Sequence, residues 1–241
     1  MVLNPKRNSE AVILGGFVCL GLALLGYLVS EGALRFKALE RSVTVKGLSE
    51  REVPADTAIW PIKFNEAENN LNTLFETIQR KTALVVGFLR ESGFASEEIS
   101  VSAPAIVDRQ AQGYADANRI PFRYAGNSTI TVYTPKVATV RTTMTRLVNL
   151  GKQGVAITGE DYSAKTEFLF SRLNEIKPAM VEEATNNARE VAEKFAQDSQ
   201  SKLGRIRRAS QGQFSIADRD STTPHIKKVR VVSTVEYYLT D

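Results

Sequence analysis

An uninterrupted apolar run near the amino terminus constrains this chain more than any other feature. Residues 11–29 read AVILGGFVCLGLALLGYLV and contain no charged side chain. At 1.5 Å per residue a helix over this run is roughly 28 Å long, which matches the hydrocarbon thickness of a bilayer. The run predicts a transmembrane helix over 11–29, preceded by a short tail over 1–10 and followed by a charged stalk over 30–41 that could continue the helix.

A secretory signal peptide is the alternative interpretation. Lys6 and Arg7 precede the apolar run, as basic residues do in a signal peptide, but signal peptides have a shorter apolar region and a small-x-small cleavage site. The segment SEGALRFKALER that follows offers no convincing site, so an uncleaved anchor is favoured. Because Arg35, Lys37 and Arg41 follow the run, the charges on its two sides nearly balance and do not determine its orientation.

Small residues recur at every fourth position of the run, at Ala11, Gly15, Cys19 and Ala23. On a helix they form one stripe that would let two backbones approach closely, which is typical of helix packing in a membrane oligomer. The alternative is that glycine and alanine are simply common in spanning helices. In either case Cys19 is expected to be a small packing residue and not a nucleophile.

Hydrophobic periodicity divides the rest of the chain into alternating strand pairs and single helices. A period of two predicts half-buried strands, and a three-to-four spacing of apolar residues predicts amphipathic helices. The expected order is ββ-α-ββ-α-ββ-α-ββ, an α+β fold of antiparallel sheets with helices packed on one face. With no obvious linker, 42–241 are expected to form one domain, with internal duplication left open. The predicted strands cover 43–46, 58–65, 99–107, 122–134, 155–170, 206–216 and 226–239, and the helices cover 70–91, 137–148 and about 173–201.

Proline and glycine give more local expectations. Pro61 predicts a bulge or an edge position in its strand, because proline cannot donate to a ladder. Pro178 predicts that the last helix begins near Lys177 or is kinked there. Glycines are expected to end the three helices, and the polar segment 108–121 is expected to be a mobile loop. The three glycines are Gly93, Gly151 and Gly204.

Composition excludes several kinds of chemistry. The chain has one cysteine and one histidine, so a thiolate pair, a Cys/His zinc site and a well-placed histidine base are nearly excluded by counting. The sequence has no phosphate-binding or dinucleotide-binding glycine motif, so no cofactor is predicted. The net charge of +4 is small and not confined to one block, so a nucleic-acid partner is not expected.

Neither the histidine nor the paired carboxylates suggest a site. His225 follows a proline at a strand end and is expected to be a surface residue. The carboxylate pairs Glu97-Glu98, Glu182-Glu183 and Asp218-x-Asp220 are expected to be solvated charge, since neighbouring residues do not converge on a metal. A catalytic role is therefore not predicted. An unrecognised carboxylate enzyme remains a minor alternative, to be tested at Asp56, Asp108 and Asp161.

Basic residues gather in the last two predicted strands. If these strands pair, the cations could form one positive surface that binds an anionic ligand or a lipid headgroup. The alternative is that lysine and arginine protect exposed strands from edge-to-edge association. In the last strand Val229, Val231, Val235, Tyr237 and Leu239 are expected to share the buried face. The candidate anion-binding residues are Arg205, Arg207, Lys227, Lys228 and Arg230.

The segment after the stalk resembles the opening of SIMPL-domain proteins, a family of bacterial envelope proteins of poorly defined activity. The resemblance rests on Val43-x-Val45-x-Gly47 followed by EREVxADxAxWP over 50–61. The helix-to-strand step Gly93-Phe94 before Glu98-Ile99, and the alanine-rich helix over 184–196 with Leu203-Gly204, are similar to later parts of the family pattern. The match spans 42–240. Gly47, Asp56, Ala58 and Gly204 stand at shared positions and are expected to serve as turns, a strand start and a tight cap.

The resemblance implies an α+β domain on the periplasmic side of the bacterial inner membrane, a cytoplasmic amino terminus and a tendency to self-associate, including assembly into rings. It also implies a link to envelope or oxidative-stress physiology, and it provides no catalytic residues. The leading hypothesis is a non-enzymatic, single-pass envelope protein whose candidate partners are its own copies, membrane lipids and another envelope protein. A binding module for an anionic ligand is the alternative.

Overall fold

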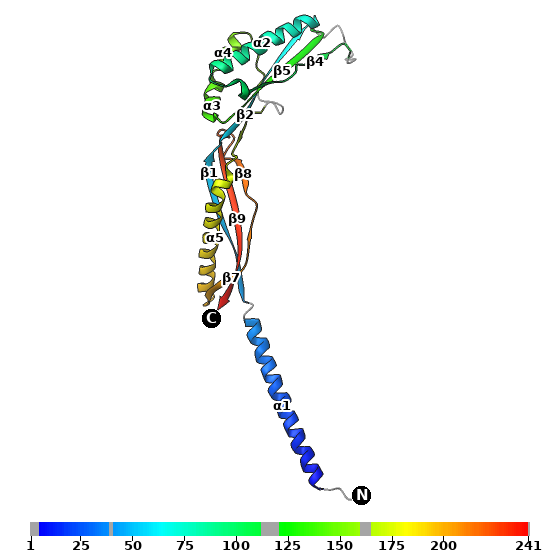
Figure 1. The fold of residues 1–241 in the computed structure, drawn as a ribbon, viewed down its shortest axis with the longest axis vertical. Coiled ribbons are helices and arrows are strands. Elements are labelled where there is room, and N and C mark those ends of the chain that lie inside the picture. The colour runs from blue at the N-terminus through cyan, green and yellow to red at the C-terminus, as the bar shows by residue number, and fades with distance from the viewer. Residues whose placement is uncertain (1–4, 39–40, 112–120, 160–164, 241) are drawn as a thin grey trace. The chain divides into compact units, whose positions relative to one another are not determined.

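The structure is a computed structural model, and it describes residues 5–38, 41–111, 121–159 and 165–240 (Figure 1). The predicted mobile loop over 108–121 and the predicted turn at 159–161 lie largely outside these residues. In chain order the elements are α1 (Pro5–Ala38), β1 (Ser42–Pro54), β2 (Thr57–Glu68), α2 (Leu71–Glu91), η1 (Ser96–Glu98), β3 (Ile99–Val101), β4 (Ala105–Asp108), β5 (Tyr124–Thr134), α3 (Val137–Thr145), α4 (Val148–Lys152), β6 (Glu167–Leu169), α5 (Leu173–Asp198), β7 (Lys202–Gln211), β8 (Ser215–Asp218) and β9 (Ile226–Thr240).

The apolar run near the amino terminus is helical, as predicted. Within α1 the stretch Leu14–Gly32 has a mean hydropathy of 1.7 and is not buried against the rest of the chain. This helix is long and apolar enough to be a membrane anchor or a signal sequence. The helix continues to Ala38, so most of the predicted stalk extends it.

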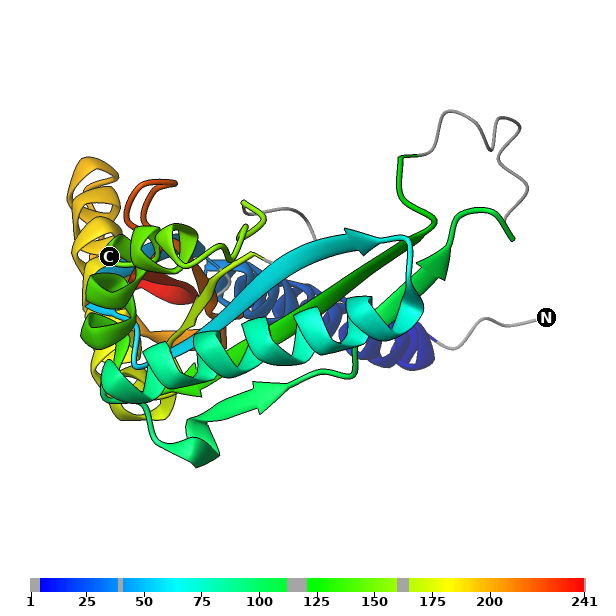
Figure 2. The ribbon, with the colours of Figure 1, turned by 90° about the horizontal axis from the view of Figure 1, so that it is seen from above.

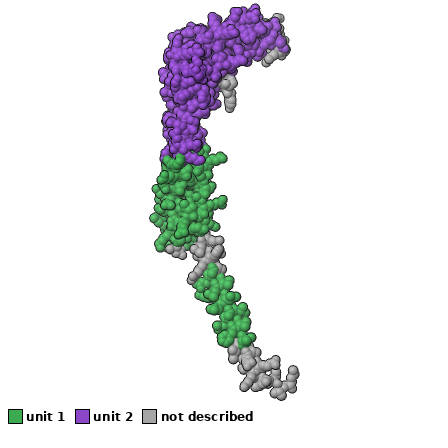
Figure 3. Space-filling view, in the orientation of Figure 1, with its two compact units in different colours: residues 1–49, 178–214, 231–241 green, residues 50–177, 215–230 purple. Residues whose placement is uncertain are grey.

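The predicted fold class is confirmed. The described strands form a four-stranded sheet with the order β1-β9-β7, in which β8 also pairs with β9, and a five-stranded sheet with the order β3-β5-β2-β6, in which β4 also pairs with β5. The chain forms two compact units (Figure 3): unit 1 comprises 1–49, 178–214 and 231–241, and unit 2 comprises 50–177 and 215–230. The expectation of one domain over 42–241 stays a prediction.

In unit 2, β2 and β5 form a long antiparallel pair, and α2 runs along it (Figure 2). Ala58, Trp60, Ile62 and Phe64 of β2 are all buried, as their period of two predicted. The register with β5 is unbroken through Pro61. There is therefore no bulge. Among the described residues β2 pairs on its other side only at 57–59 with β6 and at Phe64 with Ile157, so Pro61 has an open edge on that side, as the edge alternative predicted.

The first long helix of unit 2 follows its sequence signals closely. α2 begins after Asn70, whose side chain accepts hydrogen bonds from the backbone N–H groups of Asn72 and Thr73, a standard amino-terminal cap. It ends as predicted at Gly93, whose φ of +96° is a conformation that favours glycine. The helix is anchored by four fully buried side chains at three-to-four spacing, namely Leu74, Ile78, Val85 and Leu89.

Three predicted strand regions are split or shorter than expected. The strand over 99–107 is split into β3 and β4, because Pro104 cannot continue a ladder. The predicted strand over 206–216 is likewise split, into β7 and β8. The predicted pair over 155–170 is reduced among the described residues to β6 and a single bridge from Ile157 to Phe64.

The predicted helix over 137–148 is interrupted, and it does not end at Gly151. It forms α3 and α4, and Gly151 lies inside α4. The hydroxyls of Thr142 and Thr145 donate to the carbonyls of Ala138 and Thr142, and this local bonding competes with a continuous helix. Gly154, with a φ of +83°, ends the segment instead.

The last helix begins earlier than Pro178 suggested. α5 starts at Leu173 and continues through Pro178, although proline has no N–H to donate to the carbonyl four residues earlier. It ends at Asp198, before Gln200, which has a φ of 55°. Gly204 is therefore not a helix cap. It lies in β7 at a shift of register, where an added Cβ would be 2.9 Å from the Tyr238 carbonyl oxygen.

The core of unit 1 forms where α5 lies on β1 and β9. The predicted face of α5 is right for Met180, Ala184 and Ala188, but Val191 and Phe195 are exposed. Ala192 and Ala196 are buried in their place, so the contact face is a row of small residues at fourfold spacing. Only small side chains fit on this face of α5, because the helix lies very close to β1. A Cβ on Gly47 would be 1.9 Å from the Ala184 carbonyl oxygen.

Candidate functional site

The five predicted anion-binding cations do not share one face. Along β9, Lys227 is 7% exposed and lies on the buried face with Val229, whereas Lys228 and Arg230 point to the opposite side. The Lys227 ammonium forms an ion pair with the Asp218 carboxylate. The predicted buried face of β9 is correct from Val229 to Tyr237, but period-two alternation places Lys227 on that face too.

Two of the other cations already have carboxylate partners. Arg207 in β7 lies 2.9 Å from a carboxylate oxygen of Glu236, and Lys228 lies 3.0 Å from one of Glu50. Arg205 and Arg230 are exposed and form no ion pair with another described side chain. Two of the five cations, Arg205 and Arg230, are thus not paired with a described carboxylate and could contact an anionic ligand. Arg205 belongs to unit 1, whereas Arg230 belongs to unit 2.

The small-residue stripe of α1 has no neighbour within the described chain. Cys19 and Ala23 are exposed, and the Cβ position of Gly15 has no atom within 4 Å. The side chain of Ala11 lies outside the described residues. The prediction that this stripe packs against another helix stays a prediction.

The carboxylates considered for catalysis have internal partners. Oδ2 of Asp56 accepts hydrogen bonds from the backbone N–H groups of Ser171 and Arg172, at 2.9 and 3.2 Å, just before α5 begins. Its Oδ1 accepts from the hydroxyls of Ser171 and Thr57. Burial raises the pKa of Asp56, but these hydrogen bonds outweigh burial and hold it below its usual value. Asp56 thus holds in place the two residues that precede α5.

Asp108 is similarly engaged, and Asp161 lies outside the described residues. The Asp108 carboxylate forms an ion pair with Arg123 at 2.8 Å and accepts from the backbone N–H groups of Gln110 and Ala111. The hydrogen bond from Arg123 lowers the pKa of Asp108. Within the part of the chain that the structure describes, no three His, Cys, Asp or Glu side chains are grouped so that they could hold a metal ion.

Of the adjacent acidic pairs, Glu98 departs most from the expected solvated charge. It accepts hydrogen bonds from the Thr134 hydroxyl at 2.6 Å, the Ala95 N–H at 2.7 Å and the Lys136 ammonium at 2.9 Å. The Thr134 bond is the main reason why the pKa of Glu98 falls from its usual 4.5 to about 2. Glu98 therefore ties η1 to the end of β5.

Glu183 and Asp220 also differ from the expectation of solvated charge. Glu183 accepts a hydrogen bond from the Ser49 hydroxyl at 3.0 Å. Asp220 accepts from the N–H groups and hydroxyls of Thr222 and Thr223, and the hydroxyl bonds are the main reason why its pKa is lowered. These carboxylates organise their own surroundings and do not converge on a common point.

We expect Glu98→Gln to destabilise the protein at neutral pH by about 1–2 kcal/mol, because hydrogen bonds to an ionised group are worth more than neutral ones. The folded-state pKa lies below the unfolded one, so this contribution is complete above about pH 5 and is lost as the pH falls toward 2. Urea unfolding of both proteins between pH 7 and pH 3 measures the difference, which should shrink in acid. A difference that is constant across this range would contradict the prediction.

His225 lies directly before β9, at the strand end that its sequence context indicated, and it is half-buried. Its carbonyl accepts a hydrogen bond from the Ala55 N–H at 2.8 Å, and its ring packs edge-on against Phe168 at 6.1 Å between centroids. Burial lowers the pKa of His225, and the charges of Arg141 and Arg219 lower it further while Asp220 opposes them. The imidazole lines a cavity of about 500 Å³ in unit 2. The two arginines make its electrostatic surroundings positive.

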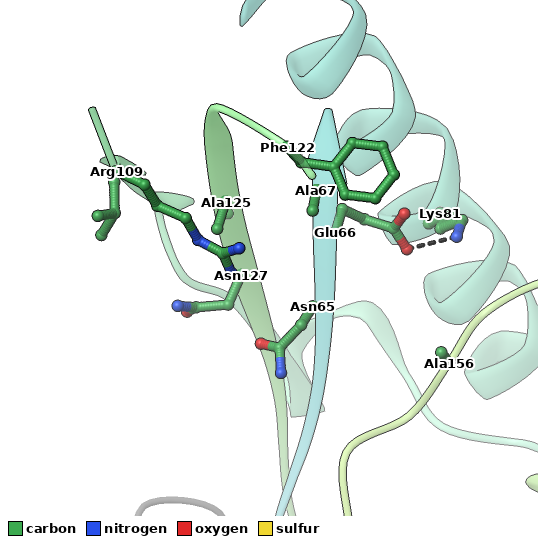
Figure 4. A pocket seen from close by; sticks show the side chains of 11 residues that line it. Asn65, Glu66, Ala67, Lys81, Arg109, Phe122, Ala125, Asn127 and Ala156 are labelled. Carbon is green, nitrogen blue, oxygen red and sulfur yellow. Dashed lines mark hydrogen bonds and ion pairs between the residues drawn. The ribbon is translucent and has the colours of Figure 1, made fainter. Parts of the chain in front are cut away.

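A second cavity of unit 2, of about 490 Å³, lies beside β2 and β5 (Figure 4). Small residues, Ala67, Ala125 and Gly126 among them, leave the space. Figure 4 shows the Glu66 carboxylate turned toward Lys81 of α2, with which it forms an ion pair. These two charges neutralise each other within the wall, and Arg109 adds a further cation to the lining.

The four-stranded sheet, with the order β1-β9-β7, has open edges. Among the described residues β1 and β7 are its outermost strands, and neither pairs on its outer side. Every residue of β7 from Arg205 to Gln211 is exposed, so this strand is open on both faces as well as along its edge. A long, exposed edge strand offers its backbone N–H and C=O groups to another strand.

Comparison with known proteins relates this chain to one family. The SIMPL family model, described as a protein of unknown function (DUF541), matches residues 43–237. The chain belongs to the SIMPL family. The match begins immediately after α1 and covers both sheets, which confirms the resemblance read from the sequence. A search of the curated proteins found no match to the chain.

Proposed function

We propose that this SIMPL protein is a non-enzymatic, single-pass membrane protein whose soluble part assembles with its own copies. In this proposal α1 anchors the chain in the bacterial inner membrane, residues 1–10 are cytoplasmic and the SIMPL domain is periplasmic. The assembly would serve as a structural or interaction module in envelope or oxidative-stress physiology.

The open edge of β7 is the observation that carries the proposal. The outer edges of β1 and β7 belong to different strands, so pairing of β1 from one copy with β7 from the next would be head-to-tail. Head-to-tail contacts close into a ring or continue as a filament, depending on the rotation between copies. The arginines of β7 limit uncontrolled pairing, and the exposed Ile206 supplies apolar contact area.

The membrane anchor strengthens weak lateral contacts. Chains held in one membrane by α1 have a high effective concentration, so a modest edge contact suffices for assembly. The exposed small-residue stripe of Gly15, Cys19 and Ala23 would add helix packing within the membrane. The internal hydrogen bonds of Asp56 and Asp108 support the non-enzymatic part, because both carboxylates already serve to hold the fold.

The full chain in uncharged detergent is expected to form an oligomer of defined mass at micromolar concentration. Ile206→Lys, which places a charge on the open edge, should shift the population toward monomer by at least tenfold in dissociation constant. Val148→Lys is the matched control, since Val148 is also exposed but lies in α4. Light scattering coupled to size exclusion measures the mass, and a monodisperse monomer of the unmodified chain would refute self-assembly.

The proposed orientation has its own test. A reporter enzyme that is active only outside the cytoplasm, fused after Asp241, should be active, and a cytoplasmic fluorescent reporter at the same position should not. The opposite pattern, or recovery of the mature chain from the soluble fraction without α1, would show that the anchor proposal is wrong.

A further inference from the structure

A cavity of about 500 Å³ in unit 2 has a chemical character that the sequence does not reveal. Its walls come from three places in the chain: α3, the segment before β6, and the turn between β8 and β9. The described residues that line it are Arg141, Met144, Lys165, Thr166, Phe168, Asp218, Ser221, Thr222, Pro224 and His225.

Two cations of this cavity remain available. Arg141 and Lys165 are exposed, and neither forms an ion pair with another described side chain. Asp218 is the carboxylate among the described lining residues, and it is engaged by the Lys227 ammonium. Among the described residues the wall therefore carries two positive charges without a carboxylate partner, which favour an anion.

The surroundings of His225 indicate the same sign of potential. Arg141 and Arg219 both disfavour protonation of the imidazole, as burial does, and Asp220 only partly offsets them. Asp220 and Glu52 are themselves paired with Arg219, at 3.0 and 3.3 Å. These carboxylates near the cavity are thus already paired with cations of the chain. Arg141 and Lys165 form no ion pair with a described side chain.

Part of the cavity wall is apolar. Phe168 is 6% exposed and packs edge-on against the His225 ring, and Met144 and Pro224 line the same space. Apolar walls with a few charged groups are typical of sites for small organic molecules. A bare inorganic ion would leave this apolar surface unused.

The turn that forms one wall is held in place before any ligand binds. One Asp220 oxygen accepts from the backbone N–H groups of Thr222 and Thr223, at 2.8 and 2.7 Å. The Arg219 N–H donates to the Ile226 carbonyl at 2.9 Å, which closes the turn onto β9. A preformed wall lowers the entropic cost of binding.

We propose that this cavity binds a small organic anion, with its phosphate or carboxylate group between Arg141 and Lys165 and its apolar body against Met144, Phe168 and Pro224. The Ser221 hydroxyl and the His225 imidazole lie on the same wall and supply neutral polar contacts. This site is distinct from the predicted cation group of β7 and β9, and it does not depend on self-assembly of the chain.

Three probes separate the parts of the proposal. Phenyl phosphate carries both the anion and an apolar ring, inorganic phosphate carries only the anion, and phenol carries only the ring. Calorimetric titration of the full chain in uncharged detergent should give an affinity for phenyl phosphate at least tenfold above that for either of the others. Equal affinities for phenyl phosphate and inorganic phosphate, or no binding of phenyl phosphate at millimolar concentration, would overturn the proposal.

The single histidine is a built-in reporter of the binding site. In protein labelled at histidine and free of a histidine tag, phenyl phosphate should shift the imidazole NMR signal of His225 with the same midpoint as the calorimetric titration. Binding that leaves this signal unchanged would place the anion elsewhere and contradict the assignment.

Substitution of the cations tests their role. Arg141→Ala with Lys165→Ala should weaken phenyl phosphate binding at least tenfold without changing the thermal unfolding temperature, because both side chains are exposed. Arg205→Ala is the matched control, since it removes an exposed and unpaired cation of β7 and should leave the affinity unchanged. An equal loss in the control would show general charge attraction and refute the site.

The anionic group could come from a free small molecule or from a lipid headgroup, and nanodiscs distinguish the two. If the occupant is a headgroup, discs containing phosphatidylglycerol should shift the His225 signal without added probe and weaken phenyl phosphate binding, compared with discs of phosphatidylcholine alone. If it is a free molecule, both disc types should give the same affinity. Loss of phenyl phosphate binding in both disc types would overturn the proposal.

Discussion

Gly47→Ala is expected to destabilise the protein by about 3–5 kcal/mol, the largest effect of any single methyl group added to the described chain. A Cβ at this position would lie 1.9 Å from the Ala184 carbonyl oxygen and 2.4 Å from the Ala188 nitrogen. Both are backbone atoms of α5, so no side-chain rotation relieves the clash and the helix must move away from β1. Typical domains are stable by only about 5–15 kcal/mol, so the substitution would remove a large share of the free energy of unfolding.

Gly87→Ala is the matched control for this substitution. Gly87 lies inside α2 with no atom within 4 Å of its Cβ position, so alanine should be neutral or should stabilise the helix by up to about 1 kcal/mol. Thermal unfolding followed by circular dichroism measures both variants. Hydrogen exchange should show faster exchange of the amides of α5 in Gly47→Ala. An unfolding temperature equal to that of the parent would show that the close contact between β1 and α5 is wrong.

Asp56→Ala is expected to cost about 2–4 kcal/mol. The substitution removes the hydrogen bonds that the Asp56 carboxylate, whose side chain is 13% exposed, accepts from the N–H groups of Ser171 and Arg172, and hydrogen bonds to a charged group contribute about 1.5–3 kcal/mol. The hydrogen bonds that lower the pKa of Asp56 stabilise the fold at neutral pH. Because the folded pKa lies below the unfolded one, this stabilisation is lost as the pH falls through the folded value, and the gap between variant and parent should close in acid.

Asp108→Ala serves as the comparison for Asp56→Ala. Asp108 accepts a similar number of hydrogen bonds, but its side chain is 25% exposed, compared with 13% for Asp56, so water replaces its lost contacts more easily. Its substitution should therefore have the smaller effect in urea unfolding at pH 7. If Asp108→Ala proved the more destabilising of the two, the structural role assigned to Asp56 before α5 would be wrong.

Elements whose signals are local were predictable from the sequence. The apolar run of α1, the stop Gly93 of α2 and the alternating core residues of β2 act through neighbours along the chain. The α+β class followed from the order of these elements. The family could also be predicted from the sequence, because its pattern begins in contiguous residues between 43 and 61 and continues in order in later segments.

The site was much less predictable. Arg141, Lys165 and His225 are far apart in sequence, and each is unremarkable in its own segment. Lys227 seemed to belong with Lys228 and Arg230, whereas alternation and the nearby Asp218 place it in the buried face. Glu98 and Asp56 carried no sequence sign of the hydrogen bonds that hold them.

By itself the sequence determined the apolar helix, the period of each long element and the scarcity of histidine and cysteine, because these properties belong to single segments or to composition. Only the tertiary structure decided that Gly47 faces Ala184, that Asp56 holds the two residues before α5, and that two cations near His225 have no carboxylate partner among the described residues. The reason is physical: burial, close packing and charge compensation depend on which distant segments meet, and periodicity within one segment does not specify its partner.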